Sequence, residues 1–141
     1  MAGYGTALAA SITGLSVRQV DYLDRKRVIR PDVQGAEGYG SKRLYSFANL
    51  VELRTLKRLR DQGISLQKVR KCLAYLHSYW PGARKPLKDL VLCSDGRTVY
   101  LGDAKGWMDL LKGGQAVFSV SIGAIWTEIE RSVKSAAKAE I

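Results

Sequence analysis

The sequence predicts an α+β protein, and three features of its first 45 residues carry that prediction. Ser16 to Gln19 forms a Ser-x-x-Gln pattern, in which each side chain can bond the other residue's backbone N–H, so a helix should start there. Thr13-Gly14-Leu15 supplies a tight connection before this helix. After the helix, glycines at positions 35, 38 and 40 indicate the tip of a hairpin. Together these features predict a helix-turn-helix followed by a basic wing.

Two helices are expected, one on each side of the tight connection. Thr6 can cap the first, over Ala7 to Ile12. In the second, Val17 and Val20 lie three positions apart and predict an apolar side. Arg30-Pro31 is expected to end the register of this second helix.

The other side of the second helix is basic. Arg18, Tyr22 and Arg25 recur at i, i+4 and i+7, which places two guanidinium groups and a phenol together. Such a face is either solvated or bound to a polyanion. The neighbouring turn and wing favour the polyanion.

The return strand of the wing reads Lys42-Arg43-Leu44-Tyr45. Side chains alternate along a strand, so Leu44 is expected to be buried while Arg43 and Tyr45 point the other way. Tyr45 has two interpretations, a DNA contact or a packing residue beside the next helix.

Two further helices are predicted after the wing. Ser46 can cap the third and Ser65 the fourth, with Gln62-Gly63 between them. Trp80-Pro81-Gly82 stops the fourth helix after about four turns, because proline cannot continue a helix. Apolar stripes run along both helices at Phe47, Leu50, Leu53, Leu56 and Leu59, and at Leu66, Val69, Leu73 and Leu76.

The last part of the chain predicts a small α+β domain. Strands at Leu90 to Cys93 and Thr98 to Leu101 flank an Asp-Gly hairpin signal, and a third strand follows at Ala116 to Ile122. Trp107 to Leu111 fits a short strand or a helical turn. An amphipathic helix closes the chain, with Ile125, Ile129 and Val133 on its apolar side. The expected domains are residues 1–80, a linker at 81–86, and a dimerisation, effector or partner domain at 87–141.

Charge is distributed unevenly along the chain. Residues 1–86 carry 16 basic and 6 acidic side chains, whereas residues 87–141 carry seven of each. The first part should therefore face a polyanion, and the basic helix-turn-helix favours nucleic acid over a membrane surface. The sequence has no apolar run near the roughly 20 residues of a membrane span and no signal-like start, which predicts a cytoplasmic, nucleoid-associated protein.

Residues suited to catalysis or metal binding are few. Cys72 and Cys93 are 21 positions apart and His77 is the sole histidine, so one chain lacks the ligands for a zinc or soft-metal site. No phosphate-binding loop or catalytic triad pattern stands out. Trp107 and Trp126 fit core or interface positions better than a ligand pocket. The expectation is a non-enzyme without a metal or cofactor, and no small-molecule effector is identified.

The chain resembles the DNA-binding domain of MerR-type transcription regulators. The order and spacing of five motifs carry the resemblance: Gly14-Leu15-Ser16, Arg18-Gln19, Arg30-Pro31, Arg43-Leu44-Tyr45-Ser46 and Gln62-Gly63-Ile64-Ser65. Runs at 17–22, 43–47, 61–66, 94–100 and 113–118 also resemble the actinobacterial subgroup that includes the cell-division regulator FtsR. The chain departs from the MerR pattern at Trp80-Pro81-Gly82, where a long dimerisation helix usually follows.

This resemblance implies sequence-specific binding of promoter DNA, with a dimer on an inverted repeat, RNA polymerase as a candidate partner, and cell-division genes as candidate targets. Arg18 and Gln19 are placed to reach base edges, arginine preferring guanine and glutamine adenine. The remaining expected DNA contacts are Ser16 at the start of the helix, Tyr22, Arg25 and Lys26 at phosphates, and Lys42, Arg43 and Tyr45 in the wing.

A second hypothesis treats the chain as a protein-interaction module. In it, the neutral segment 87–141 binds another protein, such as a toxin or a division component, and the basic domain anchors the assembly to DNA. Loss of both dimerisation and DNA affinity on deletion of this segment would favour the regulator.

Overall fold

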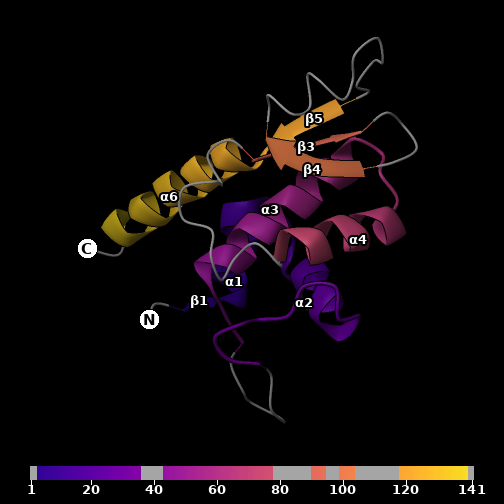
Figure 1. The fold of residues 1–141 in the computed structure, drawn as a ribbon. Helices are drawn as coiled ribbons and strands as arrows, with labels where there is room; N and C mark the ends of the chain where they lie inside the picture. Colours follow the sequence, from indigo (N-terminus) through magenta and orange to yellow (C-terminus); the bar gives the residue numbers. More distant parts are fainter. Residues whose placement is uncertain (1–2, 36–42, 78–89, 95–98, 104–117, 140–141) are drawn as a thin grey trace. The chain divides into compact units, whose positions relative to one another are not determined.

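A computed structural model describes residues 3–35, 43–77, 90–94, 99–103 and 118–139 (Figure 1). The chain divides into two compact units, residues 1–57 with 128–141, and residues 58–127. The sequence instead predicts domain boundaries at residues 80 and 87. These boundaries stay a prediction. Among the helices described, none combines the length and hydropathy that a membrane span requires.

The first unit opens with strand β1 (Tyr4–Gly5) and helix α1 (Thr6–Thr13). The expected cap at Thr6 is wrong: Gly5, still extended at the end of β1, is the N-cap, and Thr6 is the first helical residue. The expected turn is confirmed, because Gly14 ends α1 in the left-handed region at φ 82° and its N–H donates to the carbonyl of Ala10 at 3.0 Å. Helix α2 (Val17–Arg25) follows directly.

The strand of the wing pairs with a partner that the sequence did not predict. Strand β2 (Leu44–Tyr45) runs antiparallel to β1, with Tyr4 opposite Tyr45 and Gly5 opposite Leu44. Gln34 bridges Leu44 as well, and Leu44 N–H donates to the Gln34 carbonyl at 2.8 Å. The N-terminal strand therefore holds the return strand of the wing, whose tip at 36–42 lies outside the described residues.

The burial expected for the wing strand is reversed. Tyr45 is fully buried, whereas Leu44 is only partly buried. Leu44 lies against the β1 segment instead of the core: a Cβ placed at Gly3 would come within 2.9 Å of Leu44 Cβ and 3.3 Å of Val33 Cγ1. Glycine at position 3 makes this close approach possible.

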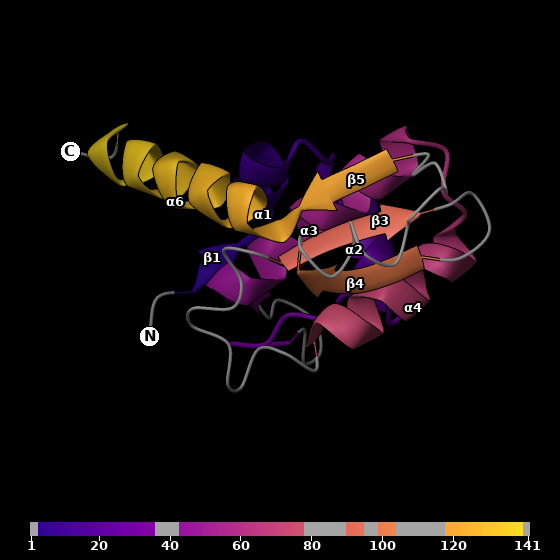
Figure 2. The same ribbon diagram turned by 45° about the horizontal axis from the view of Figure 1, so that its top comes forward.

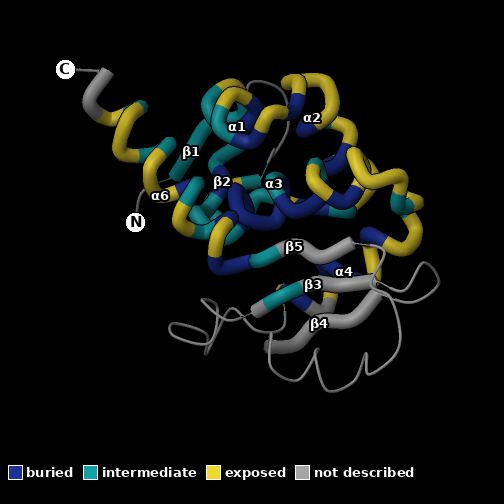
Figure 3. The backbone as a smooth tube through the Cα atoms, turned by 90° about the horizontal axis from the view of Figure 1, so that it is seen from above, coloured by how far each residue is buried: buried dark blue, intermediate teal, exposed yellow. Residues whose placement is uncertain are grey.

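Helix α3 (Phe47–Asp61) supplies much of the core, and Figure 3 shows it largely as buried backbone. The predicted stripe is confirmed at Leu50, Leu53, Leu56 and Leu59, all buried, while Phe47 is only partly buried. Within the first unit, Arg54 joins α3 to two other helices. Its Nη1 donates to the Thr13 carbonyl at 3.1 Å, and its Nη2 lies 2.9 Å from the Glu128 carboxylate on α6 (Ile122–Ala139).

The second unit contains helix α4 (Leu66–His77) and a three-stranded antiparallel sheet in the order β4-β3-β5 (Figure 2). The strands are β3 (Leu90–Ser94), β4 (Val99–Asp103) and β5 (Phe118–Ser121), and α4 lies against β4. Antiparallel pairing of β3 with β4 confirms the two predicted strands of that hairpin.

The third predicted strand and the last predicted helix are both present. The third predicted strand is seen as β5, and it ends at Ser121 because Ser121 Oγ accepts the Ala124 N–H at 3.1 Å and helix α6 begins at Ile122. Along α6, Ile125 and Ile129 are buried as predicted. The segment Trp107 to Leu111, with Trp80-Pro81-Gly82, lies outside the described residues.

Candidate nucleic-acid interface

The first turn of α2 is fixed by two reciprocal hydrogen bonds. The Gln19 N–H donates to Ser16 Oγ at 3.0 Å, and the Ser16 N–H donates to Gln19 Oε1 at 2.8 Å, so the predicted capping box is confirmed. Because a backbone N–H needs an acceptor, this bond also fixes which way the Gln19 amide faces. The amide oxygen can accept a second hydrogen bond and the NH₂ group can donate, so the adenine contact that the sequence predicts for Gln19 stays a prediction.

This turn projects from the core. Ser16, which caps the helix, and its first three residues, Val17, Arg18 and Gln19, are all exposed. Val17 lies on the side of α2 where Val20 and Leu23 are buried, so its exposure shows that the core ends before this turn. Figure 3 shows the exposed residues of α2 in yellow. Within the described residues, Arg18 has no hydrogen-bond or ion-pair partner.

Val17 departs from the apolar side that the sequence predicts. Its exposed fraction is 51%, whereas Val20, one turn further along, is fully buried. The pattern was correct for Val20 and wrong for Val17, because Val17 is the first helical residue and lies beyond the end of the core. Leu23, at the next position on that side, is buried.

The exposed side of α2 continues with Tyr22, Arg25 and Lys26. Tyr22 is 41% exposed, and the Lys26 ammonium lies 5.8 Å from the centre of its ring, within cation–π range. Arg25 Nε lies 3.3 Å from an oxygen of Asp21, one turn earlier. Because both partners are substantially exposed, this ion pair can open to a phosphate at little cost.

Helix α2 ends at Arg25, five residues before the Arg30-Pro31 stop that the sequence predicts. The backbone leaves the helix at Arg27, whose φ of 57° lies in the left-handed region and cannot continue a right-handed helix. The chain then turns back, and the Val28 N–H donates to the Leu23 carbonyl at 2.9 Å. Pro31 follows in a loop.

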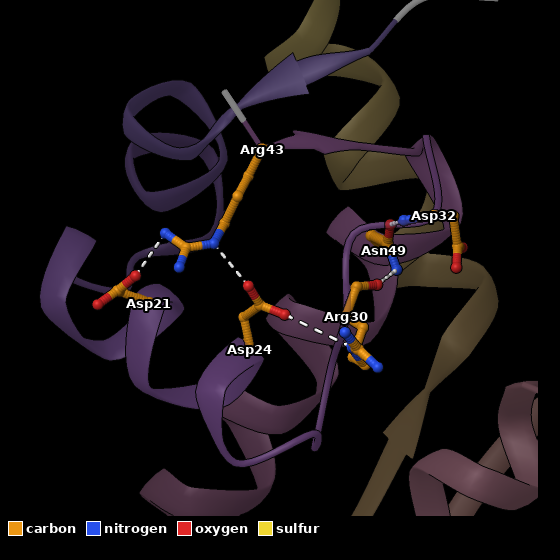
Figure 4. Close-up of polar contacts among 6 residues, drawn as sticks. All are labelled: Asp21, Asp24, Arg30, Asp32, Arg43 and Asn49. Carbon is orange, nitrogen blue, oxygen red and sulfur yellow. Dashed lines mark hydrogen bonds and ion pairs between the residues drawn. The ribbon is translucent and has the colours of Figure 1, made fainter. Parts of the chain in front are cut away.

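Arg43, the wing arginine, is bound to two carboxylates of α2 (Figure 4). Its Nη1 lies 2.5 Å from Asp21 Oδ1, and its Nε donates to Asp24 Oδ2 at 2.5 Å. Arg30 adds a looser contact of 3.7 Å to the other oxygen of Asp24. We call Arg43, Asp21 and Asp24 the wing clamp. It connects the start of the wing strand directly to the exposed basic helix.

The Arg43–Asp24 pair of the wing clamp is largely removed from solvent. The side chains of Arg43 and Asp24 are 22% and 9% exposed. Burial alone would lower the pKa of Arg43, but the hydrogen bond to Asp24 and the charges of both carboxylates outweigh it, so the pKa is raised. Arg43 therefore stays charged and engaged within the protein, and its predicted contact with DNA remains a prediction.

Tyr45 lies in the core. Its side chain is fully buried, and its hydroxyl has no hydrogen-bond partner in the part of the chain that the structure describes, which favours the packing interpretation over a DNA contact. Burial, followed by the charge of Asp24, raises the pKa of Tyr45 to about 12. Lys42, the other predicted wing contact, lies outside the described residues.

The buried phenol of Tyr45 predicts a loss of stability at alkaline pH. An unfolded tyrosine ionises near pH 10, so the contribution of Tyr45 is complete below that pH and is lost as pH rises from about 10 to about 12. The Tyr45→Phe variant should show a shallower decline across this interval in urea titrations at successive pH values. At pH 7 it should be as stable as the parent protein or up to about 1 kcal/mol more stable, because it removes an unpaired hydroxyl. Parallel pH curves for the two proteins would contradict this prediction.

Asn49 is a structural node that the sequence analysis missed. Its Oδ1 accepts the Asp32 N–H at 2.8 Å, and its Nδ2 donates to the Arg30 carbonyl at 3.1 Å (Figure 4). The same Oδ1 also accepts the Ser46 N–H at 3.0 Å. Ser46 Oγ accepts the Asn49 N–H at 3.1 Å, so Ser46 caps α3 as predicted. The Ser-x-x-Asn spacing repeats the Ser-x-x-Gln signal of α2 and could have identified Asn49.

Helix α1, its glycine turn, the exposed helix α2 and the clamped wing strand define a helix-turn-helix protein with a wing. Comparison with known families agrees: the MerR HTH family of regulatory proteins matches residues 5–76. The chain belongs to this family.

Three curated relatives are each called an uncharacterized HTH-type transcriptional regulator, one from Mycobacterium bovis and two from strains of Mycobacterium tuberculosis. Each is 38% identical to this chain over 130 residues, which are 92% of this chain and 56% of the relative. The chain thus spans about half the length of these relatives.

Proposed function

We propose that this chain binds duplex DNA sequence-specifically and regulates transcription. The observation that carries the proposal is the projecting first turn of α2, where Arg18 is exposed and has no partner among the described residues. An arginine at this place can enter the major groove and bond guanine O6 and N7. The excess of basic residues in 1–86 supplies attraction to the phosphate backbone. Membership in the MerR HTH family and the names of the mycobacterial relatives support the same function.

The rest of the proposal concerns assembly and targets. A dimer on an inverted repeat in promoter DNA is proposed, because two-fold symmetric proteins prefer two-fold symmetric sites. Resemblance to the FtsR-like subgroup adds cell-division genes as targets and RNA polymerase as a partner. Such a protein would act in the cytoplasm at the nucleoid.

Arg18→Ala tests this function. After bound duplexes have been selected from a random library, the variant should lose about 1 to 3 kcal/mol of affinity for the selected site and show relaxed base preference. Its affinity for random duplex should change much less. Arg25→Ala, which removes another arginine two turns further along α2, should weaken binding to the selected and the random duplex alike. Equal losses on both duplexes for Arg18→Ala would contradict its base-reading role.

A second candidate is the DNA-anchored interaction module, favoured by the charge balance of residues 87–141. It predicts a different result in the same selection: no enriched sequence, with affinity that falls steeply as salt is raised. An enriched inverted repeat bound by two chains would exclude the anchor-only function.

A further inference from the structure

Val17 is an exposed apolar side chain in a polar surrounding. Among the described residues, the large apolar side chains classed as exposed are Val17 and Tyr22, and both lie on α2. Tyr22 has the Lys26 ammonium near its ring, whereas Val17 lies between the exposed polar residues Ser16 and Arg18. Neither core packing nor helix formation explains it, since alanine forms helices better than valine. The two methyl groups of Val17 are free to meet an apolar group of a ligand.

Val17 is also held rigidly. The two hydrogen bonds of the capping box join Ser16 to Gln19 and enclose Val17 between them. A β-branched side chain in a helix has essentially one favoured rotamer. A contact made by Val17 therefore requires little further ordering of the protein.

The major-groove edges of the four base pairs differ in apolar character. Thymine alone presents a methyl group there, and apolar side chains recognise thymine through it. Given the proposed function, on which this inference rests, we propose that Val17 is a specificity-determining residue that reads the 5-methyl group of a thymine next to the base contacted by Arg18. Val17 thus adds an apolar contact to a helix surface that is otherwise basic and polar.

Removal of single methyl groups from the DNA tests the proposal. In the selected duplex, each thymine is replaced in turn by deoxyuridine, which lacks the methyl group and keeps both hydrogen-bonding edges. One thymine per half-site should lose about fourfold in affinity, the equivalent of one buried CH₂. With Val17→Ala, the same replacement should change affinity by less than about 1.5-fold, because the methyl group has lost its partner. Val133→Ala, a valine substitution on α6, should retain the full fourfold loss.

The possible outcomes distinguish failure of the Val17 proposal from failure of sequence-specific binding. Val17→Ala should remain folded, with an unchanged urea midpoint, because Val17 is half exposed. An equal deoxyuridine penalty in the parent protein and in Val17→Ala would overturn the proposal, and so would the absence of any sensitive thymine. Those results would leave sequence-specific binding intact. Failure to enrich any duplex would instead remove the proposed function, and this inference with it.

Discussion

Replacing Arg43 with alanine is expected to lower the free energy of unfolding by about 2 kcal/mol, because two carboxylates of α2 lose their shared cation. The loss is smaller than for a buried charge left unpaired, since Arg25 and Arg30 still contact the two carboxylates and Asp21 is 33% exposed. Urea titration at pH 7 measures the change. Arg43→Lys should fall between the two proteins, because one ammonium cannot reproduce the forked geometry that bonds both carboxylates.

Arg43→Ala should also weaken binding to all duplexes. Either Arg43 acts indirectly, by holding Asp21 and Asp24, or it contacts a phosphate itself, and a double-mutant cycle separates these two explanations. In the wing clamp, Arg43 acts through Asp21 and Asp24, so Arg43→Ala should have little effect on DNA affinity once both aspartates are replaced with asparagine. If Arg43 instead contacts a phosphate, its loss should cost the same in both backgrounds and should reduce the salt slope by about one. Near-equal losses in the two backgrounds would thus argue for direct contact.

Local signals in the sequence were enough to place the start of α2. The Ser-x-x-Gln box, the glycine turn and the cap at Ser46 each act within four residues, so their outcome depends little on the rest of the fold. The buried stripe of α3 was predictable for the same reason. Its period of three to four residues follows from helix geometry alone.

Features that depend on distant parts of the chain were not predictable. Strand β1 has only two residues and pairs through backbone groups with a strand some 40 residues later. Two residues are too few to show an alternating side-chain pattern that would predict a strand. The sequence predicted Arg43 as a basic residue of the wing. It did not predict its ion pairs with Asp21 and Asp24, because these depend on how β2 lies beside α2 in the fold. The helical period placed Val17 on the apolar side, yet periodicity does not tell how far the core extends along the helix axis.

Replacing Asn49 with alanine should destabilise the protein by about 3 kcal/mol. The side chain is 1% exposed and satisfies three backbone groups, and each hydrogen bond of this kind contributes about 1 kcal/mol. Water cannot readily replace them without opening the junction between residues 30–32 and the start of α3. Ser46→Ala, which removes the cap but leaves Asn49 in place, should cost only about 1 kcal/mol.

Amide hydrogen exchange locates the effect of Asn49. In Asn49→Ala the N–H groups of Asp32 and Ser46 lose their acceptor, so they should exchange faster than in Ser46→Ala at matched global stability, adjusted with urea. The Gln19 N–H, held by the separate capping box of α2, serves as the internal reference and should be unaffected. Equal exchange rates of the Asp32 and Ser46 amides in the two variants would mean that the destabilisation is global. That result would contradict the proposal that Asn49 links residues 30–32 to the start of α3.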